Sequence, residues 1–334
     1  MAGTPDIALV SLGTTPGLRR ADAALAEQIR AAGASCELVP VEVGRLARAL
    51  RRNAAVTDLV EALAARRAAG GLAARAMIFS TVTAALLQRP LEVPWAVRFD
   101  STAALNRPGH SGAWQRARER RVLPRARLLL PWGDEAARRA PGVVLRVPIE
   151  EIEPAPERDL HALAYAGYPS KRGLDLLCRA WSRAALPGER LVVGGVERDR
   201  ALRWLERRGV VAPDGVEWRG PLPRRDWLGL LARARVFVNA SRREDHGLAQ
   251  LEALSAGCLL VTRPSPGAYE ALPLARRLAS ELVSEDLPAA LRAGLDHPDP
   301  GGYAERAREL LRPFRAEAIR PVVADEVLPA LGVR

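Results

Sequence analysis

The sequence predicts an α/β protein made of two doubly wound domains of similar size. At 334 residues the chain is too long for one average domain. Short apolar runs alternate with amphipathic segments, a pattern typical of βαβ units and a parallel sheet. A segment rich in proline and acid, residues 148–161, interrupts the alternation, which then restarts. We therefore expect a first domain over residues 1–150, a second over residues 151–315 and a helical tail over residues 316–334.

The first domain is predicted to open with a buried strand over residues 6–13 and a glycine-rich loop over residues 13–17. An amphipathic helix over residues 18–33 follows and ends at Gly33. Further helices are expected around residues 45–67 and over residues 112–123. Apolar runs predict five more strand positions, at residues 36–41, 75–80, 95–100, 127–132 and 143–148.

The second domain repeats the alternation more clearly. Its predicted strands cover residues 162–167, 190–195, 216–220, 236–241 and 258–262. Its predicted helices begin near Leu174 and cover residues 198–209, 224–234 and 247–257. The tail is helical in pattern but is interrupted by Pro321 and Pro329, and we expect that it can cross back onto the first domain.

Composition limits the class of protein. A hydrophobic content of 48% and a charged content of 27% are those of a soluble globular chain. The net charge of +11 attracts polyanions, but arginines occur in pairs along the whole chain, which favours solvated helix faces over a dedicated nucleic-acid domain. Basic helix faces in the first domain leave peripheral contact with an anionic membrane open.

The expected location is the cytoplasm. The first residues lack a secretory pattern, and no apolar run reaches the roughly 18–20 residues that a membrane span needs. Cys36, Cys178 and Cys258 lie far apart in apolar segments, as reduced core residues do. We expect a protein that is either free in the cytoplasm or peripheral at the inner face of the membrane.

Lys171 is the single lysine of the chain, and it lies beside Arg172 between a predicted strand and a helix that begins near Leu174. The unpaired N–H groups and the dipole of a helix N-terminus favour an anion. The alternative is one lysine on a solvated loop. The position favours a phosphate site.

A second loop has similar chemistry. Gly247 permits close approach of the backbone, and the N–H groups of Leu248 and Ala249 begin the next predicted helix. Glu252 lies about one turn further, where its carboxylate can accept hydrogen bonds from sugar hydroxyls. The spacing from Glu244 to Glu252 occurs often by chance, but its position after a strand and around a glycine favours a binding site.

A third loop contains Gly220, Pro221 and Leu222. This short apolar turn can receive a nucleotide base, with hydrogen bonds to main-chain groups. An ordinary strand-to-helix turn explains the same residues equally well.

Residues 237–262 resemble the donor-site signature of retaining glycosyltransferases of the GT-B fold, in particular family 4 (glycosyl transferases group 1). The family motif is E-G-F-G-x-x-x-x-E-A, and Asp245 and His246 stand where it has Gly and Phe. The resemblance covers residues 163–272 well and includes Tyr168, where the family often has arginine. It implies two Rossmann-like domains facing each other across a cleft, an acceptor-binding domain followed by a nucleotide-sugar-binding domain.

The resemblance also implies roles for individual residues. Glu244 would be the catalytic residue that contacts the donor sugar, and Glu252 would bind the ribose. The remaining donor contacts would be Lys171 or Arg172 with the pyrophosphate, the amides of Gly247, Leu248 and Ala249 with the distal phosphate, and the turn of Gly220, Pro221 and Leu222 with the base.

The expected reaction is transfer of a sugar from a nucleoside-diphosphate sugar with retention, which the resemblance implies. Cations and helix N-termini can stabilise a leaving diphosphate without a metal. The sequence has no Asp-x-Asp pair and no His/Cys cluster at ligand spacing, so we expect neither a metal nor a cofactor. The acceptor can be a saccharide, a lipid-linked molecule or a small molecule. The alternatives are another GT-B activity, such as a nucleotide-sugar epimerase, and an inactive nucleotide-sugar-binding protein.

The first domain offers weaker candidates for acceptor or cleft residues. Gly13 and Thr14 follow the first strand, where they either approach a ligand or form a plain turn. Arg98 and Asp100 end another predicted strand, and His110 follows it. Asp100 either orients the acceptor or caps a helix.

Overall fold

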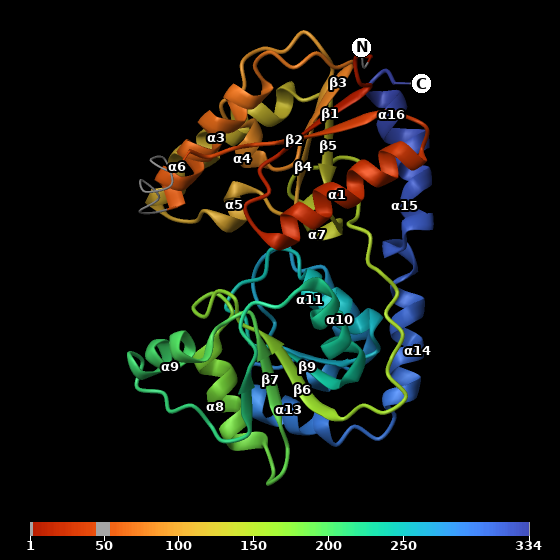
Figure 1. Cartoon of the computed structure of the whole chain (residues 1–334). Helices are drawn as coiled ribbons and strands as arrows, with labels where there is room; N and C mark the ends of the chain where they lie inside the picture. The colour runs from red at the N-terminus through yellow and green to blue at the C-terminus, as the bar shows by residue number, and fades with distance from the viewer. Residues whose placement is uncertain (1–2, 45–53, 334) are drawn as a thin grey trace. The chain divides into compact units, whose positions relative to one another are not determined.

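The computed structural model describes residues 3–44 and 54–333, which form two compact α/β units (Figure 1). Unit 1 consists of Met1–Pro148 together with Pro313–Arg334, and unit 2 consists of Ile149–Arg312. Each unit is built on its own five-stranded parallel sheet with helices packed on it. The predicted fold class, α/β with two Rossmann-like halves, is confirmed. The chain passes from unit 1 to unit 2 after Pro148 and returns to unit 1 at Pro313.

The sheet of unit 1 has the strand order β2-β1-β3-β4-β5. Its inner strands consist almost entirely of buried apolar residues, as expected where helices cover both faces of a parallel sheet. The strands are β1 (Ile7–Ser11), β2 (Cys36–Pro40), β3 (Ala76–Phe79), β4 (Trp95–Phe99) and β5 (Leu128–Pro131).

The first helix of unit 1 begins with a capped turn. The Thr15 hydroxyl oxygen accepts a hydrogen bond from the Leu18 N–H at 3.2 Å, and Pro16 occupies the first helical position. Residues 45–53 of one predicted helix lie outside the described residues, and the remainder belongs to α3. The helices are α1 (Pro16–Ala31), α3 (Ala54–Ala69), α4 (Val82–Ala85), α5 (Ala103–Asn106), α6 (Ala113–Val122) and α7 (Asp134–Ala137).

The strand predicted at residues 143–148 does not form. The segment runs beside β5, with hydrogen bonds from the Val143 N–H to the Leu129 oxygen at 3.0 Å and from the Leu145 N–H to the Pro131 oxygen at 2.9 Å. A parallel ladder also needs a bond from residue 131 back to the carbonyl of Val143. Pro131 has no N–H, so this return bond is missing and the strand prediction is wrong.

The C-terminal tail belongs to unit 1. It is helical throughout residues 316–330, as α15 (Ala316–Val322), a π-helical turn over Val323–Val327 and α16 (Leu328–Ala330). Pro321 and Pro329 therefore change the helix type instead of breaking the helix. The tail residues Ile319, Val323, Val327, Leu328, Leu331 and Val333 pack in one core cluster with residues of β1, α1 and β3.

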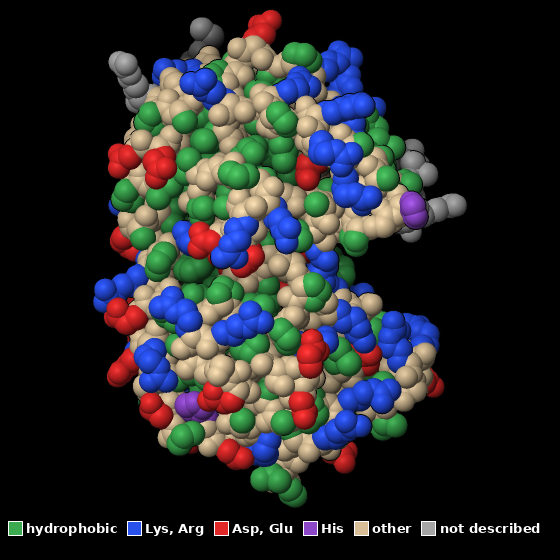
Figure 2. Space-filling model, turned by 180° about the vertical axis from the view of Figure 1, so that it is seen from behind, with side chains coloured by type: hydrophobic (Ala, Val, Ile, Leu, Met, Phe, Trp, Pro, Cys, Tyr) green, Lys and Arg blue, Asp and Glu red, His purple; other side chains and the backbone are tan. Residues whose placement is uncertain are grey.

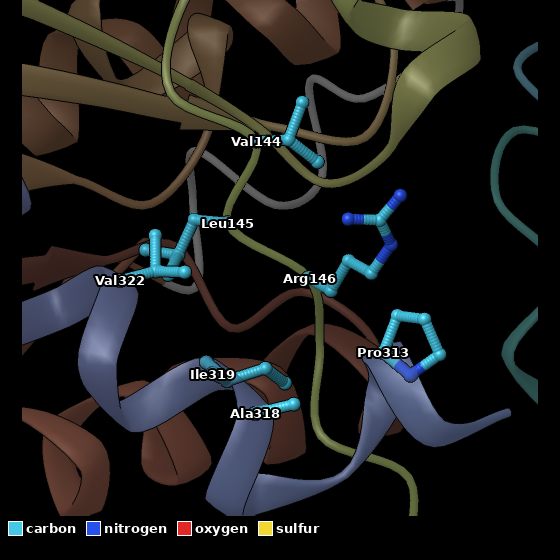
Figure 3. A pocket seen from close by; sticks show the side chains of 7 residues that line it. All are labelled: Val144, Leu145, Arg146, Pro313, Ala318, Ile319 and Val322. Carbon is cyan, nitrogen blue, oxygen red and sulfur yellow. The ribbon is translucent and has the colours of Figure 1, made fainter.

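A small cavity of about 130 Å³ lies between the tail and the segment that follows α7 (Figure 3). The guanidinium of Arg146 lies over the Phe314 ring at 5.3 Å and donates to Asp134 at 2.7 Å, which fastens the segment to the tail. The cavity is lined by Val144, Leu145, Arg146, Pro313, Ala318, Ile319 and Val322.

The sheet of unit 2 has the strand order β10-β9-β6-β7-β8. The strands are β6 (Leu160–Tyr165), β7 (Leu191–Gly194), β8 (Val216–Trp218), β9 (Ala234–Asn239) and β10 (Leu259–Thr262). The helices are α8 (Leu174–Ala184), α9 (Arg198–Glu206), α10 (Arg224–Arg233), α11 (Leu248–Ser255), α12 (Ala271–Leu278), α13 (Leu287–Leu295) and α14 (Pro300–Leu310). The predicted order of strands and helices from residue 162 to residue 262 is confirmed, and the structure adds α12, α13 and α14 after it.

Cysteines and surface charge agree with the composition. Cys36, Cys178 and Cys258 are free and buried, and burial raises the pKa of the Cys178 thiol to about 12. On the face shown in Figure 2, Lys and Arg side chains are interspersed with Asp and Glu. Among the helices of the described residues, none combines the length and apolar character needed to span a membrane.

The packing of the tail predicts that Leu331→Ala destabilises the protein by about 2–5 kcal/mol, because it removes a buried side chain from the core of unit 1. Urea-induced unfolding measures the change. Leu186→Ala is the matched control, since Leu186 is 57% exposed and its truncation should change the free energy of unfolding by less than about 0.5 kcal/mol. Equal, small effects of both changes would show that the tail does not contribute to the core.

Candidate functional site

The strand order of unit 2 creates one point where the chain reverses its direction across the sheet. The connection after β6 leads to β7 on one side, whereas the connection after β9 leads to β10 on the other. The loops after β6 and β9, residues 166–173 and 240–247, therefore diverge from adjacent strands. Open α/β sheets bind ligands at the carboxyl ends of the strands at such a point.

These two loops touch because Gly173 has no side chain. Gly173 has φ 62° and ψ 43° and precedes the first residue of α8, and a Cβ there would overlap the carbonyl oxygen of Ala240. Arg242 fastens the contact: its N–H donates to the Lys171 oxygen at 2.9 Å, and its guanidinium donates to both carboxylate oxygens of Asp175 at 2.9 and 2.6 Å. The loop positions are thus set by backbone contact and a bidentate ion pair.

Lys171 and Arg172, the two predicted cations of the loop after β6, each pair with a carboxylate of the loop after β9. The Lys171 ammonium lies 2.6 Å from Asp245, and the Arg172 guanidinium pairs with Glu244. Arg172 also lies over the Tyr165 ring, with its guanidinium carbon 5.7 Å from the ring centre. The structure therefore brings Lys171, Arg172 and Glu244 together at the carboxyl ends of β6 and β9.

Glu244 is buried, with 3% of its side chain exposed, and is held by several donors. Besides Arg172, its Oε2 accepts from Gln250 Nε2 at 2.9 Å. The Ser241 hydroxyl donates its proton to Asn239 at 2.7 Å and lies 3.3 Å from the same Glu244 oxygen. These contacts hold the Glu244 carboxylate in one orientation.

The N-terminus of α11 lies beside this carboxylate. Gly247 precedes the helix with φ 92°, and a Cβ there would lie 2.7 Å from the Tyr269 ring. The first N–H groups of the helix, including those of Leu248 and Ala249, have no carbonyl partner within the helix. Gly247 thus allows this helix end to begin against a buried aromatic ring, with its donors available to an anion.

Glu252, the residue predicted to bind ribose, lies one turn into α11 and already has protein partners. Its Oε1 lies 2.9 Å from Arg224, and its Oε2 accepts from the Trp227 indole N–H at 3.1 Å. Trp227 packs edge-on against Tyr165, with ring centres 5.6 Å apart. Glu252 is therefore a buried carboxylate with a protein partner on each oxygen.

The predicted base turn follows β8 at the same edge of the sheet. Gly220 has φ 55°, is buried, and accepts a hydrogen bond on its carbonyl from the Gly195 N–H at 2.5 Å. Pro221 is exposed and Leu222 is half-buried, so the apolar part of the turn remains accessible.

The candidates in unit 1 are not gathered in the same way. Arg98 is completely buried, where its guanidinium lies 3.6 Å from Asp22 and 4.7 Å from the centre of the Trp132 ring. Burial lowers the pKa of Arg98 to about 10, and Asp22 opposes the shift. The structure therefore places Arg98 in the core and not at an accessible surface.

The other candidates of unit 1 lie at the surface or near it. Gly13 has φ 50° and accepts a hydrogen bond from Arg19 at 2.8 Å, and Thr14 is exposed. Asp100 is half-buried after β4, and His110 is exposed.

Several contributors to these sites were not predicted. In unit 2 they are Gln250, Tyr269, Arg224 and Trp227, which hold the two glutamates or line the helix start. The positions of Gln250 and Trp227 on helix faces toward the site would have been their only sequence signal. Across residues 3–44 and 54–333, no three His, Cys, Asp or Glu side chains gather as a metal site would require.

Comparison with known proteins gives a family match for unit 2 and structural matches for the whole chain. Residues 160–297, which lie in unit 2, match the family model described as glycosyl transferases group 1. A search of curated proteins gives no match.

The fold of the whole chain is similar to that of solved glycosyltransferases. Sucrose-phosphate synthase from Thermosynechococcus elongatus matches with a TM-score of 0.72 and 15% identity, over 99% of this chain and 100% of that one. WaaG, a glycosyltransferase involved in lipopolysaccharide biosynthesis, matches with a TM-score of 0.62 and 16% identity, over 96% and 98%. Anabaena Alr3699/HepE in complex with UDP-glucose gives a TM-score of 0.64 and 13% identity, over 96% and 98%. The chain therefore has the GT-B fold.

The contact between the two loops predicts that Gly173→Ala is more destabilising than Gly188→Ala. Both glycines have positive φ, which costs a residue with a side chain about 1–2 kcal/mol. Only at Gly173 would the new methyl group also meet backbone, which adds about 1–3 kcal/mol, whereas nothing lies within 4 Å of a Cβ at Gly188. Chemical denaturation of both variants measures the difference, and equal losses would contradict the proposed close approach.

Proposed function

We propose that this protein is a glycosyltransferase that moves a sugar from a nucleoside-diphosphate sugar to an acceptor, with retention of configuration and without a metal. The observation that carries the proposal is the convergence of Arg172, Lys171, Glu244 and the start of α11 at the switch point of a domain that matches group 1 glycosyl transferases. Hexosyl transfer by a family 4 type of mechanism is the specific form that we propose.

The leaving diphosphate is the group that most needs stabilisation in this reaction. As the bond to the sugar breaks, negative charge grows on the oxygen that bridges sugar and phosphate. Arg172 and Lys171 supply positive charge from one loop, and the N–H groups of Gly247, Leu248 and Ala249 supply donors from the other. The N–H groups at the start of α11 and the Arg172 guanidinium already lie at the site, and donors that need no rearrangement are the most effective in electrostatic stabilisation.

Glu244 is the residue that we assign to the donor sugar. Its position beside Arg172 allows it to interact with the sugar that is attached to the bound diphosphate. A buried carboxylate near an oxocarbenium-like centre stabilises the developing positive charge. We propose displacement on the same face of the sugar, with the leaving diphosphate accepting the proton of the acceptor.

We assign the remaining contacts with the donor to residues at the same carboxyl edge of the unit 2 sheet. Glu252 accepts hydrogen bonds from the ribose hydroxyls while it retains Arg224 and Trp227. The base lies against the turn of Pro221 and Leu222, where apolar surface remains accessible.

Unit 1 is proposed to bind the acceptor, with Gly13, Thr14, Asp100 and His110 as the accessible candidates. WaaG, a protein of similar fold, is involved in lipopolysaccharide biosynthesis. A saccharide or a lipid-linked saccharide is therefore the class of acceptor that we propose, for a cytoplasmic protein that works free or at the inner face of the membrane.

A thermal-shift screen with UDP, GDP, ADP, TDP and their sugars tests the donor site. A ligand at about 100 times its dissociation constant adds about 2.7 kcal/mol of stability. Arg172→Ala should abolish most of the shift, because it removes a phosphate ligand, whereas Arg179→Ala on the exposed face of α8 should retain it. The absence of a shift with every nucleotide would contradict the proposal.

Glu244→Gln separates binding from turnover. The amide keeps the shape of the side chain but not its charge, so we expect the dissociation constant for the nucleotide to change by only a few-fold and kcat to fall by about 100-fold or more. The value of kcat is measured from sugar transfer or from slow hydrolysis of the donor. Glu206→Gln on the exposed side of α9 is the control, and an unchanged kcat in Glu244→Gln would remove Glu244 from the reaction.

A further inference from the structure

Asp245 connects two cations of the candidate site. Its Oδ2 lies 2.6 Å from the Lys171 ammonium, and its Oδ1 lies 3.3 Å from Arg243. Burial alone would raise the pKa of Asp245, but Lys171 and Arg243 outweigh it and hold the pKa below its usual range. The carboxylate is therefore charged at neutral pH and occupies Lys171 while no ligand is bound.

The pair of Lys171 and Asp245 is not what holds the two loops together. Arg242 already joins them through its N–H to the Lys171 carbonyl and through its guanidinium to Asp175. The second loop is also anchored by the Glu244 N–H, which donates to the Pro266 oxygen at 3.0 Å. Both anchors leave the Lys171 side chain itself unconstrained, so Asp245 acts on the ammonium and not on the backbone.

Of the three cations that pair with Glu244 or Asp245, Lys171 is the one that can most easily change partners. Its side chain is 38% exposed, compared with 19% for Arg172 and 27% for Arg243. Lysine is a compact charge on a flexible stem, whereas Arg172 is fixed by Glu244 and by the Tyr165 ring. An anion that enters the site can therefore take Lys171 from Asp245 at little structural cost.

The charges of the site determine how strongly Asp245 competes with a diphosphate for Lys171. Lys171, Arg172 and Arg243 carry three positive charges, and Glu244 and Asp245 return two negative ones. A diphosphate brings several negative charges close to Asp245, and each like-charge contact in the partly exposed site opposes binding.

We propose that Asp245 is an internal competitor for the diphosphate, which holds Lys171 in the empty site, releases it to the arriving donor and recovers it as the nucleoside diphosphate leaves. This inference rests on the proposed function and adds a residue that sets affinity and product release. Asp245 contributes its charge to this exchange and forms no bond with the sugar.

The single lysine of the chain allows a direct test. Reductive methylation followed by peptide mass spectrometry reports the labelling rate of Lys171, separately from the amino terminus. The variant is Asp245→Asn. The matched control is Asp159→Asn, which removes a carboxylate from an exposed pair with Arg233 just before β6, at the opposite edge of the sheet.

We expect Asp245→Asn to label Lys171 several-fold faster than the wild type when no ligand is present. Inorganic pyrophosphate and UDP should protect Lys171 at concentrations about five- to tenfold lower than in the wild type, the size of one close charge contact in a partly exposed site. Asp159→Asn should match the wild type in both measurements.

An unchanged labelling rate, an unchanged or higher protecting concentration, or no protection of Lys171 by either ligand would overturn the inference. Assays of sugar transfer distinguish failure of the inference about Asp245 from failure of the proposed function. Competition by Asp245 without transfer from any nucleotide sugar would contradict the proposed function alone. Transfer by a protein in which Asp245→Asn changes neither labelling nor protection would contradict the inference alone.

Discussion

The contact between the β6 and β9 loops is the constraint on which the site of unit 2 depends. The order of strands makes these loops diverge, yet Gly173 lets them meet at the carbonyl of Ala240. This contact brings cations from one loop against carboxylates from the other. The site is therefore a consequence of sheet topology and of one residue without a side chain.

Electrostatic balance explains why so many charges can lie close together in unit 2. Arg172 is compensated by Glu244, Lys171 by Asp245 and Arg242 by Asp175. Glu244 is the most buried of these carboxylates, and removing Arg172 would leave its charge uncompensated. Under the proposed function, a binding anion exchanges partners with these carboxylates and does not enter a field of free positive charge. The same principle holds in the core of unit 1, where Arg98 and Asp22 are buried together.

Much of the fold followed from the sequence because its signals are local. Buried apolar runs predicted the parallel strands, and residues 143–148 failed only because the missing partner bond belongs to Pro131, which no property of the segment itself reveals. The helical tail was visible in the pattern, but its membership of unit 1 depends on packing between residues more than 300 positions apart, such as Ile7 and Val333.

In the candidate site, too, local features could be predicted from the sequence and features that depend on tertiary packing could not. Lys171, Arg172, Glu244 and Gly247 could be placed because each lies at the junction of a strand and a helix, where sequence order determines position. The burial of Arg98 could not be predicted from the sequence. A position at a strand end indicates where the residue lies, but not which face of the sheet its side chain points to. The partners of Glu252 also come from a separate helix, and only tertiary structure brings Arg224 and Trp227 to it.

The most direct test of the central claim is a crystal structure of the protein with a bound nucleoside diphosphate. The account predicts that the distal phosphate accepts hydrogen bonds from the N–H groups of Leu248 and Ala249, and that Arg172 and Lys171 contact the diphosphate. A nucleotide bound elsewhere, with Lys171 still on Asp245 and no phosphate at the start of α11, would contradict it.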